Sequence, residues 1–202
     1  MKIKKEISLS ILGIFFLGMG LFSISLAIIQ GEMDIIFWFC YIGWSIIGYG
    51  ILTRNSFLII SQLNILTIPT IIWNIDFFYY LFTKKILFGI TSYFFSRTDI
   101  LANLVSIQHI YSLPLAFFSI YLIKTKRKDF FKLSLIQIFI IFILSKLLTQ
   151  KINNVNCVFK SCMNLGLEIK DPIYSLIWFI SYIIMIIITN FIIIKINLFK
   201  AR

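Results

Sequence analysis

The sequence predicts an all-α protein, a polytopic transmembrane helix bundle of about six spans, and three observations support this. Hydrophobic residues make up 60% of the 202 residues and charged residues only 13%, well below the roughly 25% charged residues of soluble domains. The mean hydropathy is +0.97. The apolar residues also form runs that reach or approach the roughly 17–25 residues needed to cross a bilayer.

Each apolar run is expected to be helical, because lipid offers no partner for an unpaired backbone amide. The many isoleucines would favour strands in water but do not override this constraint. The sequence contains no internal repeat and no polar linker, so residues 1–202 are expected to form a single integral membrane domain. The expected spans are residues 7–29, 35–52, 56–75, 100–123, 131–148 and 173–196.

The stretch 76–99, between the third and fourth expected spans, is apolar but interrupted by Lys84, Lys85, Gly89 and Arg97. Its many Phe and Tyr residues are typical of a membrane interface. We expect either an amphipathic helix on the membrane surface or a re-entrant segment, and the sequence leaves both open.

The positions of Lys and Arg predict the orientation, because cytoplasmic segments carry an excess of these residues. With both termini in the cytoplasm, twelve of the 19 cations lie inside and the other seven lie outside or at the outer edge. We therefore expect an integral protein of the cell membrane with both termini cytoplasmic. The net charge of +11 is assigned to this asymmetry, and no nucleic-acid partner is expected. The inside cations are Lys2, Lys4, Lys5, Arg54, Lys124, Lys126, Arg127, Lys128, Lys132, Lys195, Lys200 and Arg202.

Polar side chains inside a span are costly in lipid, so each one is a candidate for function. Asp99, Asn103, Ser106 and His109 recur at spacings of three and four residues and therefore line one helical face. At 1.5 Å per residue, His109 is expected roughly 15 Å from Asp99, near the middle of the membrane.

Other polar residues are expected on the same, outer side of the bundle. Asn74 and Asp76 come at the end of the third span, and the loop 149–172 carries Asn154 and Asn156. Together with the fourth span they predict an outward-facing polar pocket that binds a lipid or a small polar ligand.

A structural role is an open alternative for each of these residues. His109 either joins two helices by a hydrogen bond or handles a ligand or a proton. Asp76 and Asp99 are either functional or ordinary interfacial charges that face the lysines and arginine of 84–97. Asn74 and Asn103 are either ligand-binding or interhelical hydrogen-bond donors, worth ~0.6 kcal/mol on average in membranes. Catalytic residues stay unknown, with His109 and Asp76 as the candidates.

The three cysteines indicate neither a disulfide scaffold nor a metal site. Cys157 and Cys162, with four residues between them, could form a disulfide in an oxidising compartment or stay free thiols. The C-x-x-C pattern of thiol redox enzymes is absent. The one histidine lies in a different segment from every cysteine, so neither a metal nor a cofactor is expected.

Four motifs occur in order between about residues 65 and 165. They read Trp73-Asn74-x-Asp76-Phe77, Leu87-Phe88-Gly89-x-Thr91-x-Tyr93, Ser106-x-x-His109-x-x-x-x-Pro114 and Asn154-x-Asn156-x-Val158-Phe159. This series resembles a family of small prokaryotic polytopic membrane proteins that has no established activity, with the patterns WNxDF, LFGxTxY, a histidine followed by proline, and NxNWV. The resemblance implies a shared fold, and it implies one constellation made of Asn74, Asp76, Thr91, Tyr93, His109, Asn154 and Asn156.

The chain departs from that family at three positions. Gln108 stands where an aromatic residue usually precedes the histidine, Cys157 stands where tryptophan is usual, and Cys162 has no counterpart. A thiol mechanism common to the family is therefore not implied by the resemblance.

Three hypotheses for function follow. In the first, the protein binds a membrane lipid or small polar ligand without turnover, or assembles with a membrane-protein partner or a second copy of itself. In the second, it is a membrane enzyme that acts on a lipid or isoprenoid head group, with His109 as acid or base and Asp76 orienting a partner or holding a metal. In the third, it is a small channel or transporter, which requires a polar path past Gln62, Asn64 or Gln137.

Overall fold

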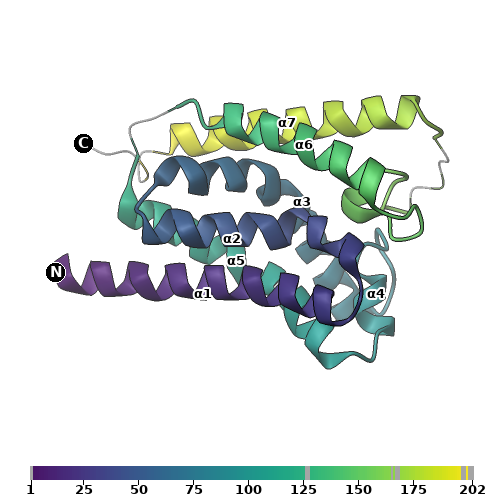
Figure 1. Cartoon of the computed structure of the whole chain (residues 1–202), viewed down its shortest axis with the longest axis horizontal. Helices are drawn as coiled ribbons and strands as arrows, with labels where there is room; N and C mark the ends of the chain where they lie inside the picture. Colours follow the sequence, from purple (N-terminus) through teal and green to yellow (C-terminus); the bar gives the residue numbers. More distant parts are fainter. Residues whose placement is uncertain (1, 126–127, 165, 167–168, 197–198, 200–202) are drawn as a thin grey trace.

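The computed structural model describes residues 2–125, 128–164, 166, 169–196 and 199, and this part of the chain is an all-α bundle without strands. The fold class predicted from the sequence is confirmed. The long helices run side by side in alternating directions (Figure 1). The elements are α1 (Lys2–Ile29), the 3-10 helix η1 (Met33–Phe37), α2 (Phe39–Leu52), α3 (Ser56–Thr83), α4 (Ser92–Ser96), α5 (Ile100–Ile123), α6 (Phe131–Leu148), the 3-10 helix η2 (Val155–Cys157) and α7 (Ile173–Lys195).

Five of these helices, α1, α3, α5, α6 and α7, are long and apolar enough to cross a membrane. The chain is therefore an integral membrane protein. The start of α1 and the end of α7 lie at one end of the bundle (Figure 1). The turn after α1, the segment with α4 and the described residues between α6 and α7 lie at the opposite end, which we call the loop end.

The segment expected as the second span differs from the others because it is divided. η1 ends at Phe37, Trp38 is extended (φ −57°, ψ 130°), and α2 has only 14 residues. At 1.5 Å per residue α2 measures about 21 Å, which is less than the roughly 30 Å of a hydrocarbon core. Trp38 is half-buried, and the loop after α6 bonds the backbone on both sides of this break, so protein groups rather than lipid pair the irregular backbone there.

The third helix is longer than the expected span 56–75 and continues to Thr83. It ends where Lys84 adopts a left-handed conformation (φ 58°) and its N–H bonds the carbonyl of Tyr80 at 2.8 Å. The remaining part of 76–99 is a loop around the five-residue helix α4. Aromatic rings pack α4 onto the end of α3, with Phe95 4.1 Å from Tyr80 and Phe94 5.1 Å from Phe77 between ring centroids.

A buried polar network joins α3, α6 and α7 near the end opposite the loops. The amides of Gln62 and Gln137 exchange two hydrogen bonds of 2.7 and 2.9 Å. Asn64 donates to Asn190 at 3.3 Å and to Ser134 at 3.4 Å. These side chains form bonds to one another, as expected for polar groups that have no access to water inside a bilayer.

The first two helices pack closely because glycine lies at their contact. A Cβ atom on Gly48 would lie 2.2 Å from the backbone nitrogen of Leu17, and one on Gly20 would lie 2.2 Å from the hydroxyl of Ser45. Gly18 on the same helix has no heavy atom within 4 Å of its Cβ position. Small residues of this kind let helix backbones approach each other in membranes.

We therefore predict that Gly48→Ala destabilises the bundle by about 1–3 kcal/mol, because the backbone of Leu17 has to move away from the added methyl group. The measurement is the free energy of unfolding in mixed detergent micelles. Gly18→Ala is the matched control, and we expect it to be neutral or slightly stabilising. Equal destabilisation by the two variants would contradict this packing.

Candidate functional site

Asp76 clamps the segment 84–99 onto α3. Its carboxylate is buried, with 2% of the residue exposed, and it accepts four hydrogen bonds. One oxygen accepts from the N–H groups of Phe88 and Gly89 at 2.7 and 3.2 Å. The other accepts from the N–H and the hydroxyl of Thr91, both at 2.8 Å. Two of the sequence motifs therefore interlock here, and hydrogen-bond donors rather than a cation compensate the charge.

The sequence left Asp76 and Asp99 open between a functional role and ordinary interfacial charges that face Lys84, Lys85 or Arg97. Both oxygens of Asp76 accept hydrogen bonds from 88–91. Asp99 instead begins α5 as its N-cap and accepts from the N–H groups of Leu101 and Ala102. It also accepts from the amide of Gln30 at 2.7 Å. These bonds, first that of Ala102 and then that of Gln30, lower the pKa of the Asp99 carboxyl below its usual value.

His109 stacks against Trp73 of α3, with ring centroids 4.9 Å apart and planes inclined by 23°. Its Nδ1 lies 2.8 Å from the carbonyl oxygen of Ser106. A carbonyl only accepts, so Nδ1 carries the proton and Nε2 keeps a lone pair. Within the described residues Nε2 has no hydrogen-bond partner, and the ring is half-buried.

Tyr93 bonds the same tryptophan, and α3 holds both the ring and the backbone of His109 through Trp73 and Asn74. The indole N–H of Trp73 donates to the hydroxyl of Tyr93 at 3.1 Å. Asn74 donates to the carbonyl of His109 at 2.8 Å and to that of Thr70 at 2.8 Å. The expected interhelical role of Asn74 is thus present, and it joins α3 to the backbone of α5 rather than to the imidazole.

Asn154 and Asn156 form a second group, in the loop after α6. Both adopt left-handed conformations, with φ 41° and 52°, which asparagine tolerates better than other residues with a Cβ atom. Asn156 accepts from the N–H of Phe39 at 2.9 Å and donates to the carbonyl of Phe37 at 2.7 Å. It therefore pairs one backbone group on each side of the break at Trp38, where α2 begins.

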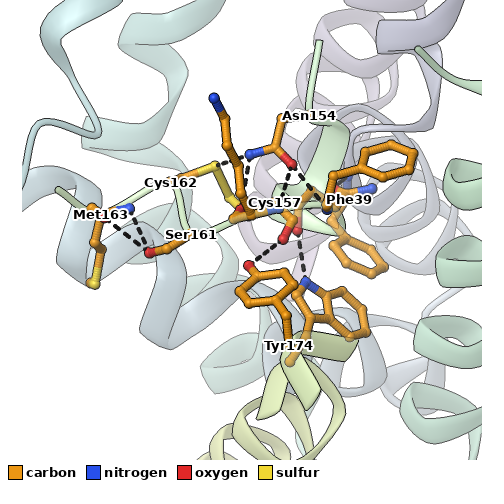
Figure 2. The surroundings of a disulfide bond; sticks show 11 residues. Phe39, Asn154, Cys157, Ser161, Cys162, Met163 and Tyr174 are labelled. Carbon is orange, nitrogen blue, oxygen red and sulfur yellow. Dashed lines mark hydrogen bonds between the residues drawn. A yellow bond between two sulfur atoms is a disulfide. The ribbon is translucent and has the colours of Figure 1, made fainter. Parts of the chain in front are cut away.

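Asn154 and a disulfide hold the rest of this loop in shape (Figure 2). Cys157 and Cys162 are bonded, with an S–S distance of 2.05 Å. The side chain of Asn154 accepts from the N–H groups of Phe159 and Lys160 and donates to the carbonyl of Lys160. Tyr174 of α7 donates to the carbonyl of Cys157, as Figure 2 shows.

The polar residues expected to form a single group therefore form two groups, which a backbone hydrogen bond joins. The first contains Asn74, Asp76, Thr91, Tyr93 and His109, and the second contains Asn154 and Asn156. They are joined where the N–H of Asn164 donates to the carbonyl of Phe88 at 2.7 Å. Asn103 donates to the carbonyl of Arg97 at 3.2 Å.

The arrangement offers an imidazole acceptor, and neither of the two expected carboxylates is free to assist it. The carboxylate of Asp76 bonds the loop 88–91, and that of Asp99 caps α5 and accepts from Gln30. Among the residues that the structure describes, no group of three or more His, Cys, Asp and Glu side chains could hold a metal ion.

Several buried polar residues were not recognised from the sequence as candidates for function, and three of them lie on α2 and α5. The indole N–H of Trp44, the whole amide of Gln108 and the hydroxyl of Ser112 are buried without a hydrogen-bond partner. The signal available in the sequence was the spacing of Gln108 and Ser112, which puts them on one face of α5.

Comparisons with protein-family models, curated proteins and solved structures found no match to this chain. Function is therefore inferred from the arrangement of the side chains.

We predict that Asp76→Asn loosens the segment 84–99. The NH2 group of the new asparagine is a donor in the place of one carboxylate oxygen, so it leaves donors of that segment unpaired. Each unpaired group costs about 1–3 kcal/mol. Trypsin should then cut the solubilised protein faster after the exposed Lys84 and Lys85. Thr91→Val removes only one of the four bonds and should have a smaller effect. Equal cleavage rates for wild type and Asp76→Asn would rule out the clamp.

Proposed function

We propose that this integral membrane protein binds a lipid head group or another small polar ligand at the loop end of its bundle, without chemical turnover. The proposal rests on the imidazole ring of His109. Its ring is held by Trp73 and by the carbonyl of Ser106, while Nε2 keeps a lone pair. A ligand with an O–H or N–H donor complements such an acceptor.

Exposed cations at the loop end favour an anionic ligand that also carries hydroxyl groups. Lys84, Lys85 and Arg97 are exposed in the segment that Asp76 clamps. Arg97 also lies over the ring of Tyr93, 5.4 Å from its centroid. A phospholipid whose head group bears free hydroxyls offers a negative charge to these side chains and a donor to His109.

Binding is better supported than catalysis because the proposed acid or base lacks a partner. In the enzyme hypothesis Asp76 orients a partner of His109 or holds a metal, but its two oxygens already accept four hydrogen bonds. A histidine acting in catalysis normally requires a second group that orients it toward the substrate. The transporter hypothesis requires a polar path past Gln62, Asn64 or Gln137, but the amides of Gln62 and Gln137 bond each other and Asn64 bonds Asn190.

We further propose that the protein lies in the cell membrane with both termini cytoplasmic, so that the loop end faces outward. The excess of Lys and Arg around the expected inside segments supports this orientation. The placement of the disulfide at the loop end agrees with it, since disulfides persist in oxidising compartments. The resemblance to a family of small prokaryotic membrane proteins and the assembly with a membrane-protein partner remain parts of this proposal.

The proposal is tested by adding phosphatidylglycerol to the purified protein in detergent and measuring the melting temperature. We expect the lipid to raise the melting temperature of the wild type. His109→Phe keeps an aromatic ring beside Trp73 but removes the acceptor. It should weaken binding by about two- to tenfold, which corresponds to the loss of one hydrogen bond.

Ser119→Ala is the matched control, because Ser119 is buried on the same helix and bonds only the carbonyl of Ala116. Its lipid-dependent stabilisation should equal that of the wild type. Stabilisation that does not depend on His109 would contradict the proposed site, and release of a product from the lipid would replace binding by catalysis.

A further inference from the structure

Three of the most deeply buried polar side chains of the bundle have no partner within the described residues. Trp44, Gln108 and Ser112 are each 1% exposed. Their unpaired atoms are the indole N–H of Trp44, both the oxygen and the nitrogen of the Gln108 amide, and the hydroxyl of Ser112. Leaving a buried polar group unpaired costs about 1–3 kcal/mol, and lipid around the bundle cannot supply a partner.

These residues converge on one region between α1, α2 and α5. Gln108 and Ser112 lie one helical turn apart on α5. Tyr111, next to Ser112, packs on Phe15 of α1, with ring centroids 5.5 Å apart. The adjacent Phe16 packs on Trp44 of α2, with centroids 5.8 Å apart. A single turn of α1 therefore contacts both Trp44 and the stretch of α5 that carries the unpaired groups.

The region is separate from the site proposed around His109. Successive residues of an α-helix are rotated by about 100°. His109 faces Trp73 of α3 and Tyr111 faces Phe15 of α1. At this rotation Gln108 and Ser112 lie between those two directions, toward the space between α3 and α1. The two neighbouring side chains therefore serve different sites.

We propose that Trp44, Gln108 and Ser112 bind ordered water inside the bundle. The four atoms include two donor groups that need an acceptor, one carbonyl that needs a donor, and a hydroxyl that can do both. Water has this combination, and a buried water typically forms about three hydrogen bonds to groups that the protein leaves unpaired. Gln108 and Ser112 then contribute a hydration site to the buried face of α5.

The test is NMR spectroscopy of the full chain in deuterated detergent with 15N-labelled tryptophan. The indole N–H signal of Trp44 is assigned by its loss in Trp44→Phe. We expect this proton to show a cross-peak to water in nuclear and rotating-frame Overhauser spectra. The control is the indole N–H of Trp178, which donates to the carbonyl of Asn156 at 2.9 Å and should show none.

Gln108→Met keeps the size of the side chain and removes both unpaired atoms of its amide. The water cross-peak of Trp44 should disappear or fall to less than half of its intensity in this variant. A wild-type spectrum without the cross-peak overturns the proposal by itself, whether or not the variant folds. A cross-peak that Gln108→Met leaves unchanged also overturns it, because the water would then not be shared with Gln108.

Discussion

The structure depends on one constraint, that polar groups inside a hydrocarbon medium must find their partners within the chain. Asp76 shows this most clearly. A buried carboxylate without partners would be very costly in such a medium, and here four donors from 88–91 surround it. The same constraint explains the paired amides of Gln62 and Gln137. Polar residues in these helices consequently act first as links between segments, and only the remaining ones are free to bind a ligand.

The loop end of the bundle is built from such links. Asp76 fixes the segment that carries Tyr93, and Tyr93 accepts a hydrogen bond from the tryptophan on which His109 stacks. Asn156 completes the broken start of α2. α2 is too short to cross a bilayer core as a straight helix, and the loop after α6 supplies hydrogen bonds to the backbone at its start. The half-buried imidazole is thus held in place by side chains from segments that lie far apart in the sequence.

Much of this architecture could be predicted from the sequence, because hydrophobic run length alone distinguishes helices in lipid from soluble folds. The spacing of Ser106 and His109 was also predictable, and His109 Nδ1 bonds the backbone carbonyl of Ser106, one turn earlier on the helix. The end of the third helix could not be predicted, because a charged residue such as Asp76 normally marks the end of a span. Its charge is compensated by a loop twelve to fifteen residues later, so the helix continues to Thr83. The bond from the N–H of Phe39 to the side-chain oxygen of Asn156 joins residues 117 apart, and no local pattern reveals such a pairing. For the same reason the polar residues expected in one constellation form two groups.

Labelling of single cysteines tests the membrane-spanning arrangement most directly. Two variants are made in a background without the natural cysteines, and each carries one new cysteine. In that background, Lys4→Cys lies near the start of α1 and Lys151→Cys lies in the exposed loop after α6. A membrane-impermeant maleimide applied to intact cells should label position 151, and it should label position 4 only after the cells are permeabilised. Labelling of both positions from the same side would contradict the bundle as a membrane-spanning unit and remove the basis for a binding site at its loop end.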